Sequence, residues 1–260
     1  MLTVLSPAKT LDFDTPAGTR RGTQPEFLER AAELVEDARG LDPAAIRDLM
    51  GVSENIAALN HRRFMDWHRP FDRDNAKQAL LAFRGDVYAG LEAETLDRAG
   101  LDFAQKHLRI LSGLYGLLRP LDLMQPYRLE MGLKFANRGG RNLYDFWGTQ
   151  ITDALGRQLK KSGTPILCNL ASNEYFKVLQ PAALDAEIIT PVFKDLKGDR
   201  YKVVSFYAKK ARGKMARYII DRQINDVPEL KKFRIAGYRY NRAESTAREL
   251  VFTRDEPPGA

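Results

Sequence analysis

The sequence predicts a single α/β domain in which a mixed β-sheet is flanked by helices. Short apolar runs such as Leu2–Leu5 and 166–171 are typical of buried strands. Amphipathic segments such as 143–161, with apolar residues at helical spacing, alternate with these runs. No internal repeat or low-complexity linker divides the 260 residues, so we expect one domain over 1–254 and a flexible tail over 255–260.

Capping residues and apolar stripes predict the helices. Thr23-Gln24-Pro25-Glu26 combines a capping box with a proline suited to a first helical turn, which predicts a helix to about Arg39. Similar signals predict further helices at 43–50, 53–67, 72–79, 143–161 and 208–224, with a short one after Ser172.

Short apolar or β-branched runs predict the strands, at 2–5, 80–83, 128–135, 166–171, 186–194, 201–206 and 250–253. Gly198-Asp199 lies between two of these runs and predicts a hairpin. A helical section over 23–80 therefore separates the first strand from the second.

The composition is that of an ordinary globular protein, with 44% hydrophobic and 29% charged residues. No apolar run reaches the roughly 18 residues of a transmembrane helix. The start, Met1–Pro7, lacks the charged and apolar regions of a secretion signal. The single cysteine, Cys168, excludes an internal disulfide. We therefore expect a cytoplasmic protein without a membrane partner.

The positive charge is concentrated in the C-terminal quarter. Residues 194–254 hold 17 Lys or Arg and 7 Asp or Glu, a net of +10, whereas the rest holds 24 and 27, a net of −3. Within this quarter, Tyr201–Arg217 has six bases and no acid. This asymmetry favours a polyanion partner. The alternative is a solvated helix face in a mildly basic protein.

The stretch Arg109–Gly132 is half apolar, is broken by glycines at Gly113 and Gly116, and carries Arg119 and Arg128 near prolines. Its glycine pattern fits a helix-hairpin-helix turn, whose backbone N–H groups can approach a phosphate. The same residues also fit a strand followed by a turn. Both interpretations stay open at this point.

Polar, cationic and tyrosine side chains follow five of the predicted strands: Ser6 and Lys9; Arg84, Asp86 and Tyr88; Ser112, Gly113 and Tyr115; Asn169, Ser172, Asn173 and Glu174; and Tyr207, Lys209 and Lys210. Because ligand sites in open α/β sheets gather at the carboxyl ends of strands, we expect these groups to line one positively charged cleft. Helix capping is the alternative explanation for Ser172 and Asn173. It does not account for Lys9, Lys209 or Lys210.

Several familiar kinds of site are missing from the sequence. Three dispersed histidines and one cysteine do not make a common zinc site, and no phosphate-binding loop or dinucleotide fingerprint is present. Cys168 lies among apolar residues, which favours a buried thiol over a reactive one. We expect no cofactor and no metal site, and no direct iron site is evident.

Long motifs resemble those of the YaaA family, also called DUF328 or UPF0246. They are Ser6–Asp12, Phe83–Tyr88, Leu111–Gly132, Asn169–Phe176 and Ser205–Gly213. The resemblance runs from Met1 to about Arg254, and nothing is transferred from Asn241 onward. It implies a bacterial peroxide-stress protein that keeps free iron low. It also implies one α/β domain with a helix-hairpin-helix-like element and a basic cleft that binds duplex DNA.

Two functions follow from these observations. The first is sequence-independent binding of duplex or structured DNA, through phosphate contacts from Lys9, Arg84, Arg109, Gly113, Tyr115, Gly116, Arg119, Arg128, Lys209, Lys210 and Arg212. The second is an enzyme that acts on a nucleotide-like or phosphorylated small molecule, with Asp86, Asn169, Asn173, Glu174 and Lys9 as catalytic candidates. A shared pocket for Lys9, Asp86, Glu174 and Lys209 favours the second function, whereas cations spread along an open groove favour the first.

Overall fold

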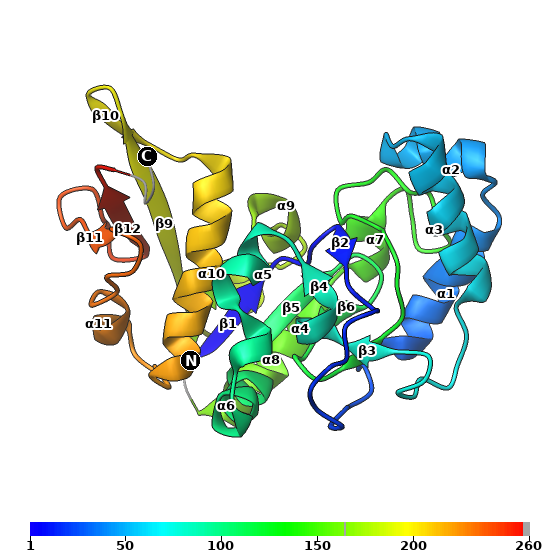
Figure 1. Ribbon diagram of the computed structural model, residues 1–260, viewed down its shortest axis with the longest axis horizontal. Coiled ribbons are helices and arrows are strands. Elements are labelled where there is room, and N and C mark those ends of the chain that lie inside the picture. The colour runs from blue at the N-terminus through cyan, green and yellow to red at the C-terminus, as the bar shows by residue number, and fades with distance from the viewer. Residues whose placement is uncertain (164, 257–260) are drawn as a thin grey trace.

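The computed structural model describes residues 1–163 and 165–256, and it contains the predicted mixed sheet flanked by helices (Figure 1). The strands of this sheet are β1 (Leu2–Leu5), β5 (Leu108–Ser112), β6 (Gly116–Leu118), β8 (Ile166–Asn169), β9 (Glu187–Lys197), β10 (Arg200–Lys202), β11 (Arg239–Tyr240) and β12 (Glu249–Arg254). Their order is β11-β12-β9-β8-β1-β5-β6, with β10 paired to β9.

The centre of the sheet is parallel and its margins are antiparallel. Strand β1 pairs in parallel with β5 and β8, β8 with β9, and β9 with β12. Strands β6, β10 and β11 pair antiparallel with β5, β9 and β12. All four residues of β1 are buried. The chain continues to β5 on one side of β1 and later to β8 on the other, an arrangement that leaves room for a ligand beyond the strand ends.

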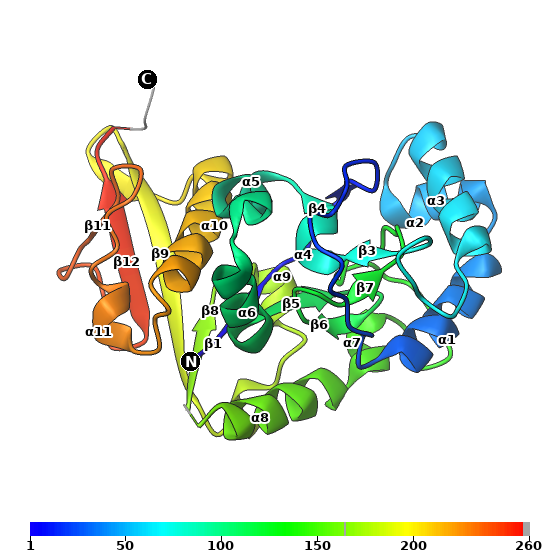
Figure 2. The same cartoon turned by 60° about the horizontal axis from the view of Figure 1, so that its bottom comes forward.

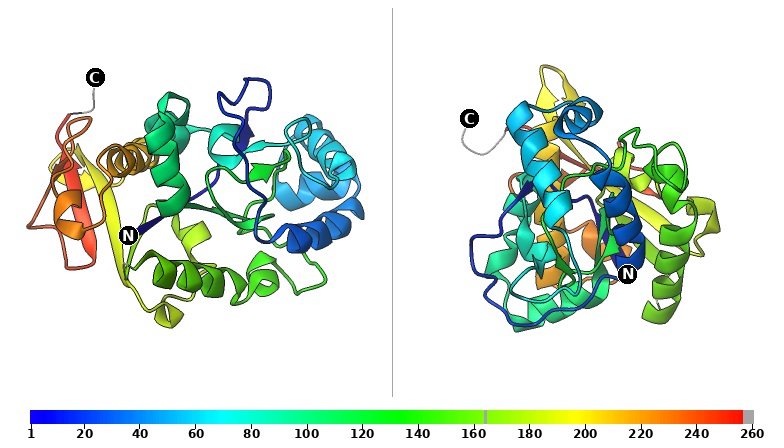
Figure 3. Two further views of the ribbon diagram at one scale, coloured as in Figure 1. Left: turned by 90° about the horizontal axis from the view of Figure 1, so that it is seen from below. Right: turned by 90° about the vertical axis from the view of Figure 1, so that its right-hand side faces the viewer.

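Helices cover both faces of the sheet. The α-helices of the described chain are α1 (Leu28–Arg39), α2 (Pro43–Met50), α3 (Glu54–Asp66), α4 (Ala79–Ala82), α5 (Asp86–Leu91), α6 (Arg98–His107), α7 (Leu143–Trp147), α8 (Gln150–Ser162), α9 (Asn173–Phe176), α10 (Ser205–Asp221) and α11 (Val227–Leu230). Helices α6 and α10 lie on one face and α8 on the other (Figures 2 and 3). Helices α1, α2 and α3 gather at the end of the molecule remote from β9 and β12 (Figure 1).

Short elements complete the fold. The 3-10 turns η1 (Ala93–Thr95) and η2 (Pro181–Ala183) connect longer segments. Strand β2 (Thr10–Leu11) pairs with β4 (Phe83–Arg84), and β3 (Lys77–Gln78) pairs with β7 (Leu123–Met124), both antiparallel. None of the helices described is long and apolar enough to cross a membrane. Residues 257–260 of the predicted tail lie outside the described residues, whereas Asp255 accepts a hydrogen bond of 2.6 Å from the Tyr201 hydroxyl.

Several predicted elements are confirmed, including the first buried strand, the helices after Asp42 and Ser53, and the hairpin of β9 and β10. The capping box at Thr23 is wrong, because its hydroxyl donates to Asp122 at 2.6 Å and α1 begins only at Leu28. Residues 72–79 form no helix until Ala79, residues 79–82 are helical, and 128–135 form no strand. The long helix predicted over 143–161 is broken at Gly148, where φ is +48°.

Residues 109–119 form a strand, a turn and a second strand, so the helix-hairpin-helix interpretation of this segment is wrong. Ile110 pairs with Leu118, and Ser112 with Gly116. The Ser112 hydroxyl accepts the N–H of Tyr115 at 2.9 Å and closes the turn. This hairpin lies in the core, since Tyr115 is fully buried.

Helices α5 and α10 touch through their backbones. A β-carbon added to Gly213 would lie 1.8 Å from the carbonyl oxygen of Val87, and one added to Gly90 would lie 2.1 Å from that of Lys210. No side chain fits in either place, so glycine is required at both. The contact fixes α5 against the second and third turns of α10.

We predict that Gly213→Ala destabilises the fold, because the added methyl group must push the two helices apart. The expected loss is about 1–3 kcal/mol, measured as the free energy of unfolding in urea. Gly156→Ala is the matched control, since its added methyl would meet only ordinary contact, 3.7 Å from Leu184. This control should be neutral or gain about 0.5–1 kcal/mol. Equal stability of Gly213→Ala and the wild type would contradict the backbone contact.

Candidate functional site

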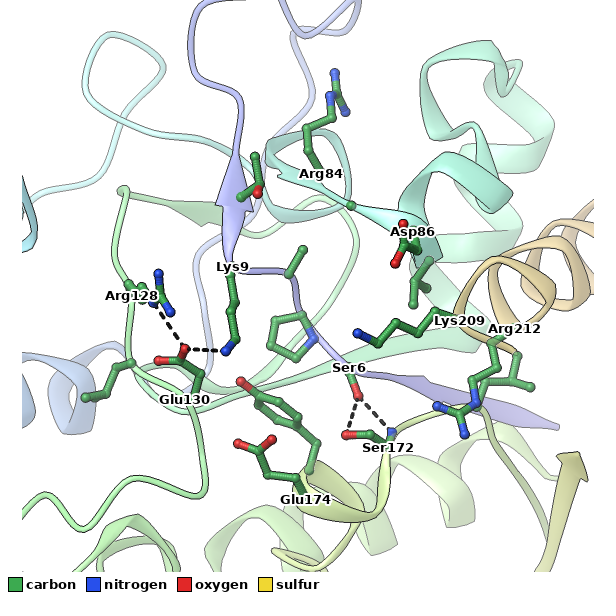
Figure 4. Close-up of a pocket in the computed structure, with 18 of the residues that line it drawn as sticks. Ser6, Lys9, Arg84, Asp86, Arg128, Glu130, Ser172, Glu174, Lys209 and Arg212 are labelled. Atoms are coloured by element: carbon green, nitrogen blue, oxygen red, sulfur yellow. Dashed lines mark hydrogen bonds and ion pairs between the residues drawn. The ribbon is translucent and has the colours of Figure 1, made fainter. Parts of the chain in front are cut away.

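A cavity of about 350 Å³ lies beyond the carboxyl ends of β1 and β8 (Figure 4). Its lining comes from the loop after β1, the β4–α5 junction, the loop after Pro126, the start of α9 and the second turn of α10. The polar lining residues are Ser6, Lys9, Thr10, Arg84, Asp86, Tyr127, Arg128, Glu130, Ser172, Glu174, Tyr175, Lys209 and Arg212.

The structure brings part of the expected set of strand-end residues together: groups that follow four of the five predicted strands line the cavity, whereas Ser112, Gly113 and Tyr115 do not. Lys9, Asp86, Glu174 and Lys209, whose relative positions separate the two functional hypotheses, all line this one cavity. The cations Arg84, Arg128 and Arg212 line it as well.

Two serines join the ends of β1 and β8. The Ser6 hydroxyl accepts the backbone N–H of Ser172 at 2.8 Å and donates to the Ser172 hydroxyl at 3.2 Å. Within the described part of the chain, the Ser172 hydroxyl proton has no acceptor, so it can be donated to a ligand. This link joins the loop after β1 to the residue that precedes α9, and it fixes the part of the cavity wall that the two serines form.

The pairing of β2 with β4 brings the loop that carries Lys9 next to Arg84. Thr10 pairs with Arg84, and the Arg84 guanidinium lies 2.8 Å from the Asp12 carboxylate. The backbone N–H of Thr15 and the nearby cations lower the pKa of Asp12. Asp12 is therefore ionised at neutral pH and neutralises Arg84.

Glu130 pairs with two further cations. Its Oε1 atom lies 3.1 Å from Lys9 Nζ and 3.1 Å from Arg128 Nε. The Glu130 side chain is 11% exposed, and its Oε2 atom is buried without a hydrogen-bond partner among the residues described. Glu130 thus holds Lys9 in place on one side of the cavity, as Figure 4 shows.

Lys209 and Arg212 differ from these cations, because neither forms an ion pair or hydrogen bond within residues 1–163 and 165–256. Lys209 is exposed and Arg212 is half-buried. Burial lowers the pKa of the Arg212 guanidinium, which means that its charge is costly in the empty cavity. Asp86 also lacks such a partner in the same part of the chain, where the Glu174 carboxylate accepts only the Gly132 N–H, at 3.0 Å.

Other predicted phosphate contacts lie away from the cavity. Arg109 is buried and donates to Gln158 and to the Gln105 carbonyl oxygen. Arg119 pairs with Asp122 at 2.9 Å. Gly113 accepts the Trp147 indole N–H at 3.0 Å, and a β-carbon on Gly116 would lie 2.8 Å from the Trp147 ring. These glycines serve packing of the core.

Tyr115 and three further candidates also fall outside the cavity lining. The Tyr115 hydroxyl accepts from the Trp67 indole at 3.0 Å in the core. The Asn169 amide oxygen accepts the Ala171 N–H at 3.0 Å and so shapes the turn after β8. Asn173 and Lys210 are exposed and do not line the cavity.

Sequence reasoning missed Glu130, Tyr127 and Tyr175. Tyr127 shares a 2.6 Å hydrogen bond with the Ser112 hydroxyl, and burial raises the pKa of both tyrosines. Glu130 and Tyr127 lie in an irregular loop with no periodicity to reveal its neighbours. The one signal in the sequence that could have identified Glu130 is its position two residues after Arg128, the cation with which it pairs.

The described residues contain no group of three or more His, Cys, Asp or Glu that could hold a metal ion. Cys168 is fully buried in β8. Its burial raises the pKa of the thiol to about 12.

The fold and the cavity define an α/β protein with a candidate ligand site at the carboxyl edge of its parallel strands. The chain belongs to the YaaA family: the family model described as "Peroxide stress protein YaaA" matches residues 1–244. A UPF0246 protein from Cellvibrio japonicus is 56% identical over 257 residues, which cover 99% of this chain and 100% of that protein. The resemblance seen in the motifs is confirmed, and membership supports a role in peroxide stress.

We predict that Cys168 is inert in the folded protein, because only the thiolate reacts readily and the buried thiol stays protonated. Ellman's reagent at pH 8 should label less than a tenth of the native protein in the time that it fully labels protein unfolded in urea. Rapid stoichiometric labelling of the native protein would show that this thiol is accessible and contradict its placement.

Proposed function

We propose that this protein contributes to the peroxide-stress response by binding a phosphorylated small molecule in the cavity and acting on it as an enzyme. One observation carries the proposal: Lys9, Asp86, Glu174 and Lys209 share a cavity of about 350 Å³. A volume of this order suits a small molecule. It is much too small for a duplex, whose phosphates need an extended surface.

Charge supports a phosphate at one end of the cavity. Lys9 and Arg128 already pair with Glu130, and Arg84 already pairs with Asp12. Lys209 and Arg212 reach the cavity from α10 on the side of Ser6 and Ser172, away from Glu130 (Figure 4). A phosphate there would receive charge-assisted hydrogen bonds and would offset the cost of burying the Arg212 charge.

Acid–base groups support catalysis. Asp86 forms no ion pair among the described residues, so its carboxylate can accept a proton from a ligand. The Lys9 ammonium, which pairs with Glu130, can donate one. Glu174 offers a second carboxylate at the opposite side of the cavity from Asp86 (Figure 4). We infer that proton transfer to or from the bound ligand is the chemistry of this site.

We predict that Lys209→Ala and Arg212→Ala each weaken binding of phosphorylated ligands about tenfold or more, because each removes a charged hydrogen-bond donor. Lys210→Ala is the matched control: it removes an identical charge from the next residue of α10, outside the cavity. A panel of nucleotides and sugar phosphates in thermal-shift experiments identifies a ligand, and calorimetry then gives its affinity.

Two results would overturn this proposal. No stabilisation of the wild type across a broad panel would remove the small-molecule site. Equal losses of affinity from Lys209→Ala and Lys210→Ala would show that the ligand is attracted by the overall charge of this surface and does not enter the cavity.

A second function, sequence-independent binding of DNA, is favoured by a different observation. The start of α10 and the preceding strand expose Lys202, Lys209 and Lys210 with no acid between Tyr201 and Arg217. We propose that this surface contacts phosphates of duplex DNA. We also propose that the limitation of free iron implied by the family resemblance is an indirect effect of the protein's action in the cavity.

We predict that the double variant Lys209→Glu, Lys210→Glu abolishes duplex binding at moderate salt. The control is Lys160→Glu with Lys161→Glu, an exposed pair on α8 at the opposite face of the sheet (Figure 3). Fluorescence anisotropy at several salt concentrations should show affinity lost in the first variant and kept in the second. Unchanged affinity of the α10 variant would exclude this surface.

A further inference from the structure

Phe206 exposes most of a large apolar side chain beside the two unpaired cations. It is 56% exposed and lies in the first turn of α10, whose second turn carries Lys209 and Arg212. Large hydrophobic residues exposed to this extent are few in the described chain, and the others are Met65 and Val203.

Phe206, Lys209 and Arg212 follow one another at intervals of three residues, so each is a neighbour of the next on the helix surface, displaced by about 60° around the axis. Phe206 is exposed and lies outside the cavity lining, Lys209 is exposed and lines the cavity, and Arg212 lines the cavity and is half-buried. With a rise of about 1.5 Å per residue, the row spans about 9 Å. A ligand with phosphate at one end and a flat apolar group at the other matches this row.

The Phe206 ring rests against a buried support. Its centroid lies 5.6 Å from that of Tyr207 in an edge-to-face contact. The Arg254 guanidinium stacks over Tyr207 at 4.6 Å and over Tyr238 at 4.3 Å, and Arg254 pairs with the buried Asp195. These contacts hold the first turn of α10, so the aromatic surface is presented in advance of binding.

We propose that Phe206 stacks on the base of a nucleotide whose phosphate is bound by Lys209 and Arg212, so that the ligand class is a nucleoside monophosphate. This inference rests on the proposed function of the cavity and specifies which class of phosphorylated molecule it binds. Aromatic side chains stack on any base because every base has a π-face, whereas a sugar phosphate has none. Stacking would also remove the exposed Phe206 surface from water.

The test compares AMP with ribose 5-phosphate by calorimetry, for the wild type, Phe206→Ala and Phe206→Trp. We expect Phe206→Ala to weaken AMP binding by about 5- to 100-fold and to leave ribose 5-phosphate unchanged. Phe206→Trp should retain or improve AMP binding. Met65→Ala, which removes an exposed hydrophobic side chain from α3, is the control and should change neither affinity.

The outcomes separate this inference from the proposed function. If both ligands bind equally well and Phe206→Ala changes neither, the base is not recognised by Phe206, and the cavity remains a phosphate site. If Phe206→Ala weakens both ligands equally, Phe206 supports the helix and the stacking proposal is overturned. If neither these nor other phosphorylated compounds bind the wild type, the proposed function fails and the inference fails with it.

Discussion

The backbone contact between α5 and α10 determines which charges face the cavity. Because Gly90 and Gly213 leave no space for a side chain between the helices, α5 and the second and third turns of α10 are held at a fixed separation. Asp86 lies in the first turn of α5, and Lys209 and Arg212 lie in the second turn of α10. The sheet supplies the remaining walls, since Ser6 and Ser172 follow neighbouring parallel strands and bond to each other.

The electrostatics of the cavity differ between its two sides. On one side the largely buried Glu130 carboxylate pairs with both the exposed Lys9 and the partly buried Arg128, and it offsets one of their two charges. On the α10 side the cations have no such partner in the described chain. A half-buried guanidinium without a partner lowers the stability of the empty protein, and an anionic ligand offsets that cost. This contrast is the physical reason for assigning the phosphate to Lys209 and Arg212.

The sequence was sufficient to predict the parts of the site that follow buried parallel strands, because the apolar pattern reveals those strands and their parallel order brings their ends together. Parallel strands end at one edge, so the residues after Leu5 and Asn169 could be expected to meet. The glycine-rich turn after Ser112 misled the prediction, because its glycines serve core packing: Gly116 leaves space for the Trp147 ring, and Gly113 lies against the Leu129 backbone and accepts the Trp147 indole N–H. The same motif letters fit a ligand loop and a tightly packed core hairpin.

Glu130 was beyond prediction for a different reason. It lies in an irregular loop, and its partner Lys9 is distant in sequence and brought close by tertiary packing alone. Arg109 shows the converse: a strand residue named for its charge turns to α8, where Gln158 and backbone oxygens satisfy it. Charge identifies candidates, and topology decides which of them share a site.

The most direct test of this account is a crystal structure of the protein grown with saturating AMP. We predict phosphate oxygens within hydrogen-bond distance of Lys209 Nζ and the Arg212 guanidinium, inside the cavity beyond β1 and β8. A structure in which AMP lies elsewhere, or in which the cavity holds only solvent although solution measurements show binding, would contradict the central claim.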